Sequence, residues 1–159
     1  MGDVIVGISE YAVSSDPSAR LVTYSLGSCV GLALHDPVAG VAGLLHAMMP
    51  TAKADPAKAA AIPAMYVDAG STALLQELFD RGATRSNLVA KVIGAASQLD
   101  PANLFRIGER NHLVVRKVLW KNGILIAGED VGGTISRSVF LEVATGRTTV
   151  KSSGEFKEV

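Results

Sequence analysis

The sequence predicts an α+β fold, with a single domain over residues 1–150 and a polar C-terminal tail over 151–159. The chain has 159 residues, 48% of them apolar and 19% charged, which suits one well-packed unit. Short apolar runs typical of strands are separated by glycine and proline turns, and two longer stretches have apolar residues at helical spacing. These segments do not alternate regularly, which favours α+β over a doubly wound parallel sheet.

The first third of the chain is expected to form strands. Strands are predicted over 4–6 and 20–26, with the polar loop 14–18 between them. The clearest local motif is a hairpin of 30–35 and 41–49. Its turn has the sequence Asp36-Pro37-Val38-Ala39-Gly40, which contains three residue types that turns favour.

Helices are expected mainly in the second half of the chain. Residues 51–63 predict an exposed loop or a short helix, and 65–81 a longer helix that ends before Gly82. A second long helix is predicted over 107–120. Further short strands are expected over 87–94, 124–127, 138–143 and 148–150, and the polar residues 152–159 are expected to fray.

Charge and composition exclude several classes of function. Fifteen Lys and Arg balance 15 Asp and Glu, and this net charge of zero argues against nucleic acid as a partner. Aromatic residues make up only 5%, too few for stacking single-stranded bases. The first ten residues lack the basic start of a secretory signal, and no apolar run approaches the ~20 residues that span a bilayer. We therefore expect a cytoplasmic protein that is not inserted in a membrane.

Cys29 is the only cysteine, and it lies in Leu26-Gly27-Ser28-Cys29-Val30, where a glycine break opens onto an apolar run. A lone thiol in a reducing compartment is either a small buried hydrophobe or a reactive centre. A free thiol has a pKa of ~8.5, so a reactive one needs a base or a cation beside it.

The predicted hairpin brings Cys29 and His46 to the same end of one ladder. A four-residue loop places Cys29 directly opposite His46, with Cβ atoms ~5 Å apart. A five-residue loop instead places Cys29 opposite Ala47 and Val30 opposite His46, so both registers stay open. His35 is nearer in sequence, but six residues of strand put it ~20 Å from Cys29, too far for proton transfer. We expect His35 to be a solvated turn residue.

These residue types would suit nucleophilic catalysis. His46 can take the thiol proton, and Thr23 on the preceding strand can orient the imidazole through its other nitrogen. Gly27 and Ser28 form a turn that can aim backbone N–H groups at an oxyanion. The alternative is an inert buried cysteine beside an ordinary histidine.

The other polar residues predict no further site. His112 is expected on a helix surface, and Arg137 is expected to be an ordinary exposed charge. Three scattered histidines and one cysteine lack metal-ligand spacing, so no metal and no other cofactor is predicted. The glycines of 128–133 lack the Lys-Ser/Thr of a phosphate loop and predict a turn.

Most of the chain resembles the CheD family of chemoreceptor glutamine deamidases. The resemblance is carried by the Cys29 segment, by the His46 segment that ends in Met49-Pro50, and by three later motifs. These are Ala90-Lys91-Val92-Ile93-Gly94-Ala95, Ile107-Gly108-Glu109-Arg110-Asn111, and Asp130-Val131-Gly132-Gly133 followed by Arg137 and Thr145-Gly146. Two stretches depart from the family pattern: the residues that flank His46, and 94–97.

The resemblance implies a cysteine hydrolase that converts receptor glutamines to glutamate and releases ammonia. It implies Cys29 as nucleophile, His46 as general base and acid, and Thr23 as the orienting group. It also implies layered sheets in a sandwich flanked by a few helices, similar to deamidating bacterial toxins. The implied partners are the cytoplasmic helices of chemoreceptors and a CheC-type phosphatase of the response regulator. The alternative is a non-catalytic adaptor that binds these two partners.

Overall fold

The computed structural model describes residues 2–97 and 105–159, and over these residues the α+β prediction is confirmed. Three α-helices and two short 3-10 helices accompany two five-stranded sheets. The strands are β1 (Gly2–Ile5), β2 (Glu10–Ser14), β3 (Ala19–Leu26), β4 (Val30–Asp36), β5 (Val41–Ala47), β6 (Val89–Gly94), β7 (Ile126–Val131), β8 (Arg137–Glu142), β9 (Thr148–Ser152) and β10 (Glu155–Glu158). The helices are η1 (Ala52–Ala54), α1 (Pro56–Ala61), η2 (Pro63–Met65), α2 (Val67–Asp80) and α3 (Ile107–Lys121).

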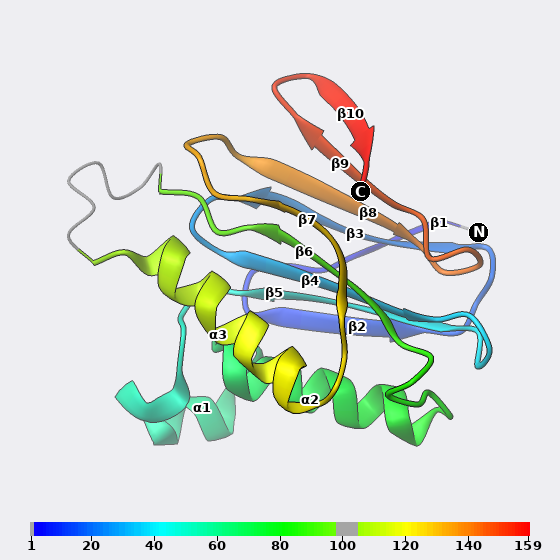
Figure 1. The fold of residues 1–159 in the computed structure, drawn as a ribbon, viewed down its shortest axis with the longest axis horizontal. Coiled ribbons are helices and arrows are strands. Elements are labelled where there is room, and N and C mark those ends of the chain that lie inside the picture. The colour runs from blue at the N-terminus through cyan, green and yellow to red at the C-terminus, as the bar shows by residue number, and fades with distance from the viewer. Residues whose placement is uncertain (1, 98–104) are drawn as a thin grey trace.

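The two sheets are stacked, and α2 and α3 cover the free face of the sheet that contains β4 and β5 (Figure 1). The outer sheet has the order β1-β3-β8-β9-β10, and the middle sheet has the order β2-β5-β4-β6-β7. Both sheets are mixed, because β1 pairs with β3 and β6 pairs with β7 in parallel while the other neighbours are antiparallel. The molecule therefore has three layers: helices, middle sheet and outer sheet.

Alternation along β4 and β5 divides their side chains between two cores. Val30, Leu32 and Leu34 pack with the apolar side chains of α2 and α3. Ala33 of β4 and Leu44 of β5 pack instead with residues of the outer sheet. Strands buried on both faces lose the polar alternation of a surface strand, which explains the nearly continuous apolar sequence of this hairpin.

The hairpin is confirmed, but its register differs from both predicted alternatives. Asp36 pairs with Val41, so the four-residue loop is Pro37–Gly40 and lies one residue later than expected. His46 consequently pairs with Gly31. The side chain of Asp36 explains this shift, because its Oδ1 accepts hydrogen bonds from the N–H groups of Val38 and Ala39 and thereby ends the strand.

Two strands occupy segments that were not expected to be strands. Glu10–Ser14 forms β2, which pairs with β5. Glu155–Glu158 forms β10, so the prediction that the polar C-terminal residues fray is wrong. These residues pair antiparallel with β9, and beyond them Val159 N donates to the Thr148 carbonyl. The short polar strand lies at the edge of its sheet, where alternation with apolar residues is not required.

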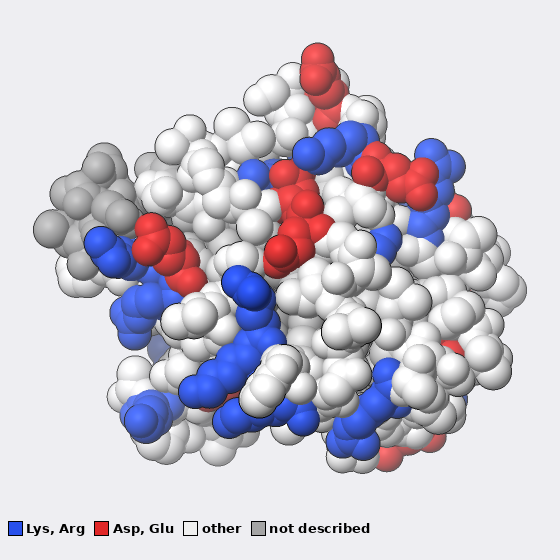
Figure 2. All heavy atoms as spheres, viewed as in Figure 1, with Lys and Arg blue, Asp and Glu red and all other residues white. Residues whose placement is uncertain are grey.

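Charged side chains of both signs share the face drawn in Figure 2, where basic residues lie close to acidic ones. This mixture agrees with a net charge of zero. None of the helices among residues 2–97 and 105–159 combines the length and the apolar character needed to cross a membrane.

Candidate active site

Cys29 lies in a short loop, Gly27 to Cys29, that joins β3 of the outer sheet to β4 of the middle sheet. The thiol side chain is partly buried and packs against the core between the sheets. The loop is tied to the end of β6, because Ala96 N donates to the Gly27 carbonyl and Ala95 N donates to the Cys29 carbonyl, both at 2.8 Å. The backbone around the thiol is therefore fixed from the direction of β6.

A glycine makes this close approach possible. Gly94 has a φ of +102°, and a Cβ built at this position would collide with the Cys29 carbonyl oxygen. Ala95, which follows it, also has a positive φ, of 54°. L-residues rarely adopt such conformations, so the turn after β6 holds backbone strain at the point where it contacts the loop that contains Cys29.

His46 lies on β5 and faces the layer between the two sheets. Its residue is fully buried, and its backbone pairs with Gly31, two residues after Cys29. Cys29 lies in the loop directly before β4, and its side chain packs against the same inter-sheet layer. The thiol and the imidazole therefore share one face and one end of the ladder, in a diagonal rather than a directly opposed relation.

Thr23 reaches His46 from the opposite sheet. Thr23 is on β3 and fully buried, and its Oγ1 lies 2.7 Å from His46 Nδ1 and 2.7 Å from the Val6 carbonyl oxygen. A carbonyl can only accept, so the single hydroxyl proton goes to Val6. The Thr23 oxygen must then accept from His46, which places the ring proton on Nδ1.

The other nitrogen of this imidazole is left with a lone pair. His46 Nε2 is buried and has no hydrogen-bond partner among the described residues. Burial lowers the pKa of His46 to about 4, so the ring is neutral at physiological pH. Burial also raises the pKa of Cys29, although a hydrogen bond from its own backbone N–H acts in the opposite direction. The resting pair is thus a neutral thiol and a neutral imidazole.

Two sequence predictions about polar residues are wrong. His35 is buried rather than solvated, and its Nε2 donates to the Val143 carbonyl at 3.0 Å. His35 lies at the opposite end of β4 from Cys29, in agreement with the separation expected from six residues of strand. Arg137 is buried rather than exposed, because its guanidinium donates to the carbonyls of Gly94 and Gly132 and so ties β8 to the end of β6.

Asn111 is a site residue to which the sequence assigned no role. It lies on α3, is fully buried, and its Nδ2 donates to the Ser28 carbonyl at 2.8 Å and to the Met48 carbonyl at 2.9 Å. The only indication of Asn111 in the sequence is the motif of residues 107–111, and that motif does not predict which carbonyl groups the Asn111 side chain contacts. His112, its neighbour on α3, is partly exposed as predicted and contacts Glu129.

The described residues suggest no metal site beside the thiol. Among residues 2–97 and 105–159, no three His, Cys, Asp or Glu side chains gather as metal ligands. An apolar hollow of about 800 Å³ lies elsewhere, between the exposed face of α3 and the start of β7, and it is lined by residues that include Leu113, Trp120 and Leu125. Its position is unconnected with the arrangement of Thr23, Cys29 and His46.

The family model described as "CheD chemotactic sensory transduction" matches residues 48–152 of this chain. The chain is 46% identical over 159 residues to the probable chemoreceptor glutamine deamidase CheD of Solibacter usitatus, covering 100% of the chain and 94% of the relative. It is 47% identical over 154 residues to the probable chemoreceptor glutamine deamidase CheD 1 of Syntrophus aciditrophicus, covering 97% and 96%. The corresponding protein of Pyrococcus horikoshii is 39% identical over 166 residues, covering 100% and 98%.

Solved structures offer only a distant likeness. The crystal structure of the hypothetical protein YfiH of Bacillus licheniformis has a TM-score of 0.46 and 15% sequence identity. The match covers 76% of this chain and about half, 49%, of that chain.

Proposed function

The chain belongs to the CheD family of chemoreceptor glutamine deamidases, and from this premise we propose that it hydrolyses receptor glutamine side chains by a reaction that Cys29, His46 and Thr23 carry. The enzyme is an amidohydrolase: water replaces the amide nitrogen, and the products are glutamate and ammonia. The family determines the overall reaction, and the roles of these three residues are the proposal.

The first half of the reaction forms a thioester. As Cys29 Sγ bonds to the amide carbon, His46 Nε2 takes the thiol proton, and the carbonyl oxygen becomes an oxyanion. We propose that this oxyanion accepts hydrogen bonds from backbone N–H groups of the loop at Gly27, Ser28 and Cys29. The imidazolium then returns its proton to the amide nitrogen while the C–N bond breaks, so ammonia leaves as a neutral molecule.

The second half regenerates the thiol. His46 Nε2 takes a proton from water, and the resulting hydroxide oxygen bonds to the thioester carbon. When the C–S bond breaks, the imidazolium proton goes to the Cys29 sulfur, and the product leaves as the carboxylic acid, which then loses its proton to water and becomes glutamate. No redox change occurs, and protein groups together with water supply every proton.

The observation that carries the proposal is the state of the His46 ring. Thr23 accepts from Nδ1, so the lone pair lies on Nε2, and Nε2 is buried without a partner among the described residues. A buried nitrogen without a hydrogen bond costs stability, which is acceptable where the atom receives a proton during a reaction. An inert core histidine would be expected to satisfy both nitrogens.

The low basicity of His46 determines how the thiol is activated. With its pKa lowered to about 4 by burial, His46 cannot hold a resting ion pair with a thiol whose own pKa is raised by burial. We therefore propose that the proton moves only as Sγ attacks the bound amide. Such a thiol is protected from adventitious oxidation and alkylation between turnovers.

Mass spectrometry of a cytoplasmic receptor fragment tests the proposal. With the wild-type protein, the receptor fragment should gain the mass difference between an amide and an acid at particular glutamines. With the Cys29→Ser and His46→Gln variants, its mass should not change. His35→Gln is the matched control, because His35 is also a buried histidine of the same hairpin but lies at its other end. We expect this variant to remain active.

Two results would contradict the proposal. Deamidation by Cys29→Ser at the wild-type rate would exclude the thiol as nucleophile. Binding of the receptor fragment without turnover, equal in wild type and in Cys29→Ser, would instead support the adaptor alternative.

Partners and location follow from the same premise. The substrate partner is the cytoplasmic region of a chemoreceptor, and we place the enzyme in the cytoplasm, where that region lies. Binding of a CheC-type phosphatase is also proposed, and it rests on the family resemblance alone. The likeness to deamidating bacterial toxins stays a prediction of that resemblance.

A further inference from the structure

Asn111 is a buried amide on α3 whose two N–H protons are both used on backbone carbonyls. Its Nδ2 donates to Ser28 O at 2.8 Å and to Met48 O at 2.9 Å. Because both neighbours are acceptors, the orientation of the amide is determined: the oxygen cannot take the place of the nitrogen. We infer that Asn111 is a positioning residue for the deamidation, one that sets the orientation of the Ser28–Cys29 peptide and holds it at a constant distance from the strand of His46.

The geometry of a trans peptide explains the first part of this role. The carbonyl of Ser28 and the N–H of Cys29 belong to one planar unit and point in opposite directions. When Asn111 holds the Ser28 carbonyl toward α3, it turns the Cys29 N–H away from α3. The same residue carries this N–H and the reacting sulfur, so the orientation of the Ser28–Cys29 peptide sets where the N–H points relative to that sulfur. We infer that this N–H is one of the donors that stabilise the oxyanion at the attacked carbon.

The neighbouring peptides are held in the same way by other groups. The carbonyls of Gly27 and Cys29 accept from Ala96 N and Ala95 N. Three successive carbonyls of the loop therefore have donors from the protein body, and only the middle donor is a side chain. The Ser28–Cys29 peptide is the one whose orientation depends on a replaceable residue.

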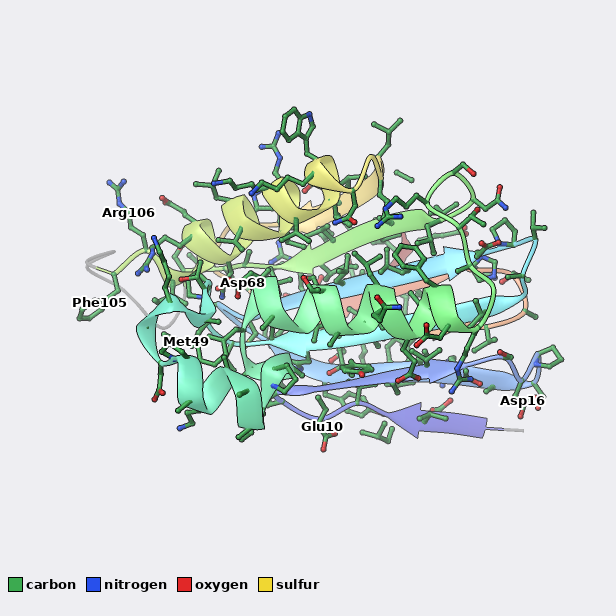
Figure 3. All side chains as sticks on the ribbon, turned by 90° about the horizontal axis from the view of Figure 1, so that it is seen from below. Glu10, Asp16, Met49, Asp68, Phe105 and Arg106 are labelled. Atoms are coloured by element: carbon green, nitrogen blue, oxygen red, sulfur yellow. The ribbon has the colours of Figure 1, made fainter. Side chains whose placement is uncertain are left out.

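The second bond joins the loop to the other half of the site. Met48 follows β5 and lies two residues after His46, and its carbonyl accepts from the same Nδ2 atom. In Figure 3, Met49 lies at the same end of the molecule as Arg106, the residue before α3. One side chain thus bridges the segment of the nucleophile and the segment of the base at the open end of the hairpin, where the β4–β5 ladder no longer joins them.

A further detail favours a role beyond packing. Asn111 Oδ1 is buried and has no hydrogen-bond partner among the described residues. A buried acceptor without a partner lowers stability, so the favourable contacts of this amide come from its Nδ2, which holds two carbonyls. Gly108, one helical turn earlier, brings α3 against the carbonyls of Ala95 and Ala96, which a Cβ would prevent.

This inference rests on the proposed function, and Asn111→Ala and Asn111→Asp variants test it on the full chain. In Asn111→Ala, kcat on a receptor fragment should fall about 100-fold with KM changed less than about threefold, because transition-state donors are displaced while the binding surface remains. Asn122→Ala is the matched control. Asn122 also lies at α3, and its Nδ2 donates to a carbonyl, that of Val118, far from the thiol.

Asn111→Asp provides a signature that a merely structural role would not give. An ionised carboxylate cannot donate to the two carbonyls, whereas a protonated carboxyl can donate to one of them. The kcat of Asn111→Asp relative to wild type should therefore rise as the pH falls, and the ratio for Asn111→Ala should not. If Asn111→Ala does not fold, this pH dependence of Asn111→Asp decides the question.

The rate of Cys29 alkylation by iodoacetamide separates this inference from the proposed function. The backbone N–H of Cys29 lowers the pKa of its own thiol, so a peptide that turns when the Asn111 bond is lost should raise the pH midpoint of alkylation in Asn111→Ala above that of wild type. If wild type does not deamidate but the midpoint shifts, the proposed function fails and the positioning of Cys29 stands. If wild type deamidates and both kcat and the midpoint are unchanged in Asn111→Ala, the inference is overturned. A kcat loss that merely matches the loss of folded protein also overturns it.

Discussion

At the scale of single residues, the hydroxyl group of Thr23 determines the tautomer of His46, because it has only one proton to donate. Thr23 donates that proton to the Val6 carbonyl and can only accept from the imidazole. The buried ring then has a defined tautomer and a free lone pair on Nε2. A carboxylate in this position would also raise the pKa of the ring, whereas a neutral hydroxyl leaves the ring a weak base.

Replacing the hydroxyl of Thr23 by a methyl group should reduce turnover and leave substrate binding intact. In Thr23→Val the imidazole loses the acceptor for Nδ1, so kcat should fall at least about 10-fold, and less than the about 10⁴-fold seen when a catalytic histidine is held in the wrong tautomer. Steady-state kinetics on a receptor fragment measures this.

The controls for Thr23→Val separate the hydroxyl from packing. Thr23→Ser keeps the hydroxyl and should keep most of kcat. Thr148→Val removes a hydroxyl that donates to the Gly146 carbonyl from another buried threonine, away from Cys29. An unchanged kcat in Thr23→Val would show that His46 needs no orienting group.

At the scale of elements, the turn after β6 supports the loop between β3 and β4. Gly94 and Ala95 have positive φ angles, and their backbone contacts the Cys29 carbonyl. The start of α3 rests on the same turn, since a side chain at Gly108 would collide with the carbonyl oxygens of Ala95 and Ala96. Loop, turn and helix thus form one support for the thiol.

Gly94→Ala should therefore damage the site as well as the fold. An L-residue at a φ of +102° is strained by on the order of 1–2 kcal/mol, and the new Cβ would push the Cys29 carbonyl away. We expect kcat to fall more than about 10-fold, as displaced catalytic groups do. Kinetics at a temperature where circular dichroism shows the variant folded will measure the effect.

Gly40→Ala is the matched control for this substitution. Gly40 also has a positive φ, of +68°, but a Cβ there has nothing within 4 Å. Its variant should lose some stability and keep its kcat. An equal loss of kcat in both variants would mean that general strain, and not displacement of the Cys29 loop, is responsible.

At the scale of the whole molecule, the stacking of two sheets buries a titratable group between them. His46 is fully buried, and burial lowers its pKa to about 4, below the ~6.5 expected in the unfolded chain. Burial lowers the pKa of His35 as well. Charging either ring opposes the folded state.

The stability of the protein should accordingly fall as the pH falls from ~6.5 toward about 4. Between these two pH values His46 is protonated in the unfolded state and neutral in the folded state. The contribution of His46 to the free energy of unfolding is therefore complete above pH ~6.5 and is lost as the pH falls toward about 4. For one proton, the free energy of unfolding changes by at most about 1.4 kcal/mol per pH unit, and the total change across this pH range is on the order of 3 kcal/mol.

Urea unfolding at several pH values will measure this dependence in wild type and in His46→Gln. His35 and the carboxylates contribute to both proteins, so the difference between the two curves isolates His46. Wild type should lose more stability on acidification than His46→Gln does. Parallel curves would mean that His46 has the same pKa in the folded and the unfolded protein.

Much of the element structure was predictable from local patterns, and the exceptions have physical causes. The β4–β5 hairpin and helices α2 and α3 were predicted because their turns and apolar spacing are local features. The hairpin register was not, because the Asp36 side chain caps the strand one residue later than composition suggested. The burial of Arg137 was missed because its partners, the carbonyls of Gly94 and Gly132, are brought together only by folding.

The nearness of Cys29 and His46 at one end of a hairpin could be predicted from the amino-acid order, because chain connectivity and turn chemistry act over a few residues. Folding alone brings Thr23 to face His46 from another sheet and brings Asn111, on a helix, to join the segments of Cys29 and His46. Thr23 and His46 are 23 positions apart in the sequence, and Asn111 and Ser28 are 83 positions apart. Such contacts depend on how layers stack, which no local pattern in the chain specifies.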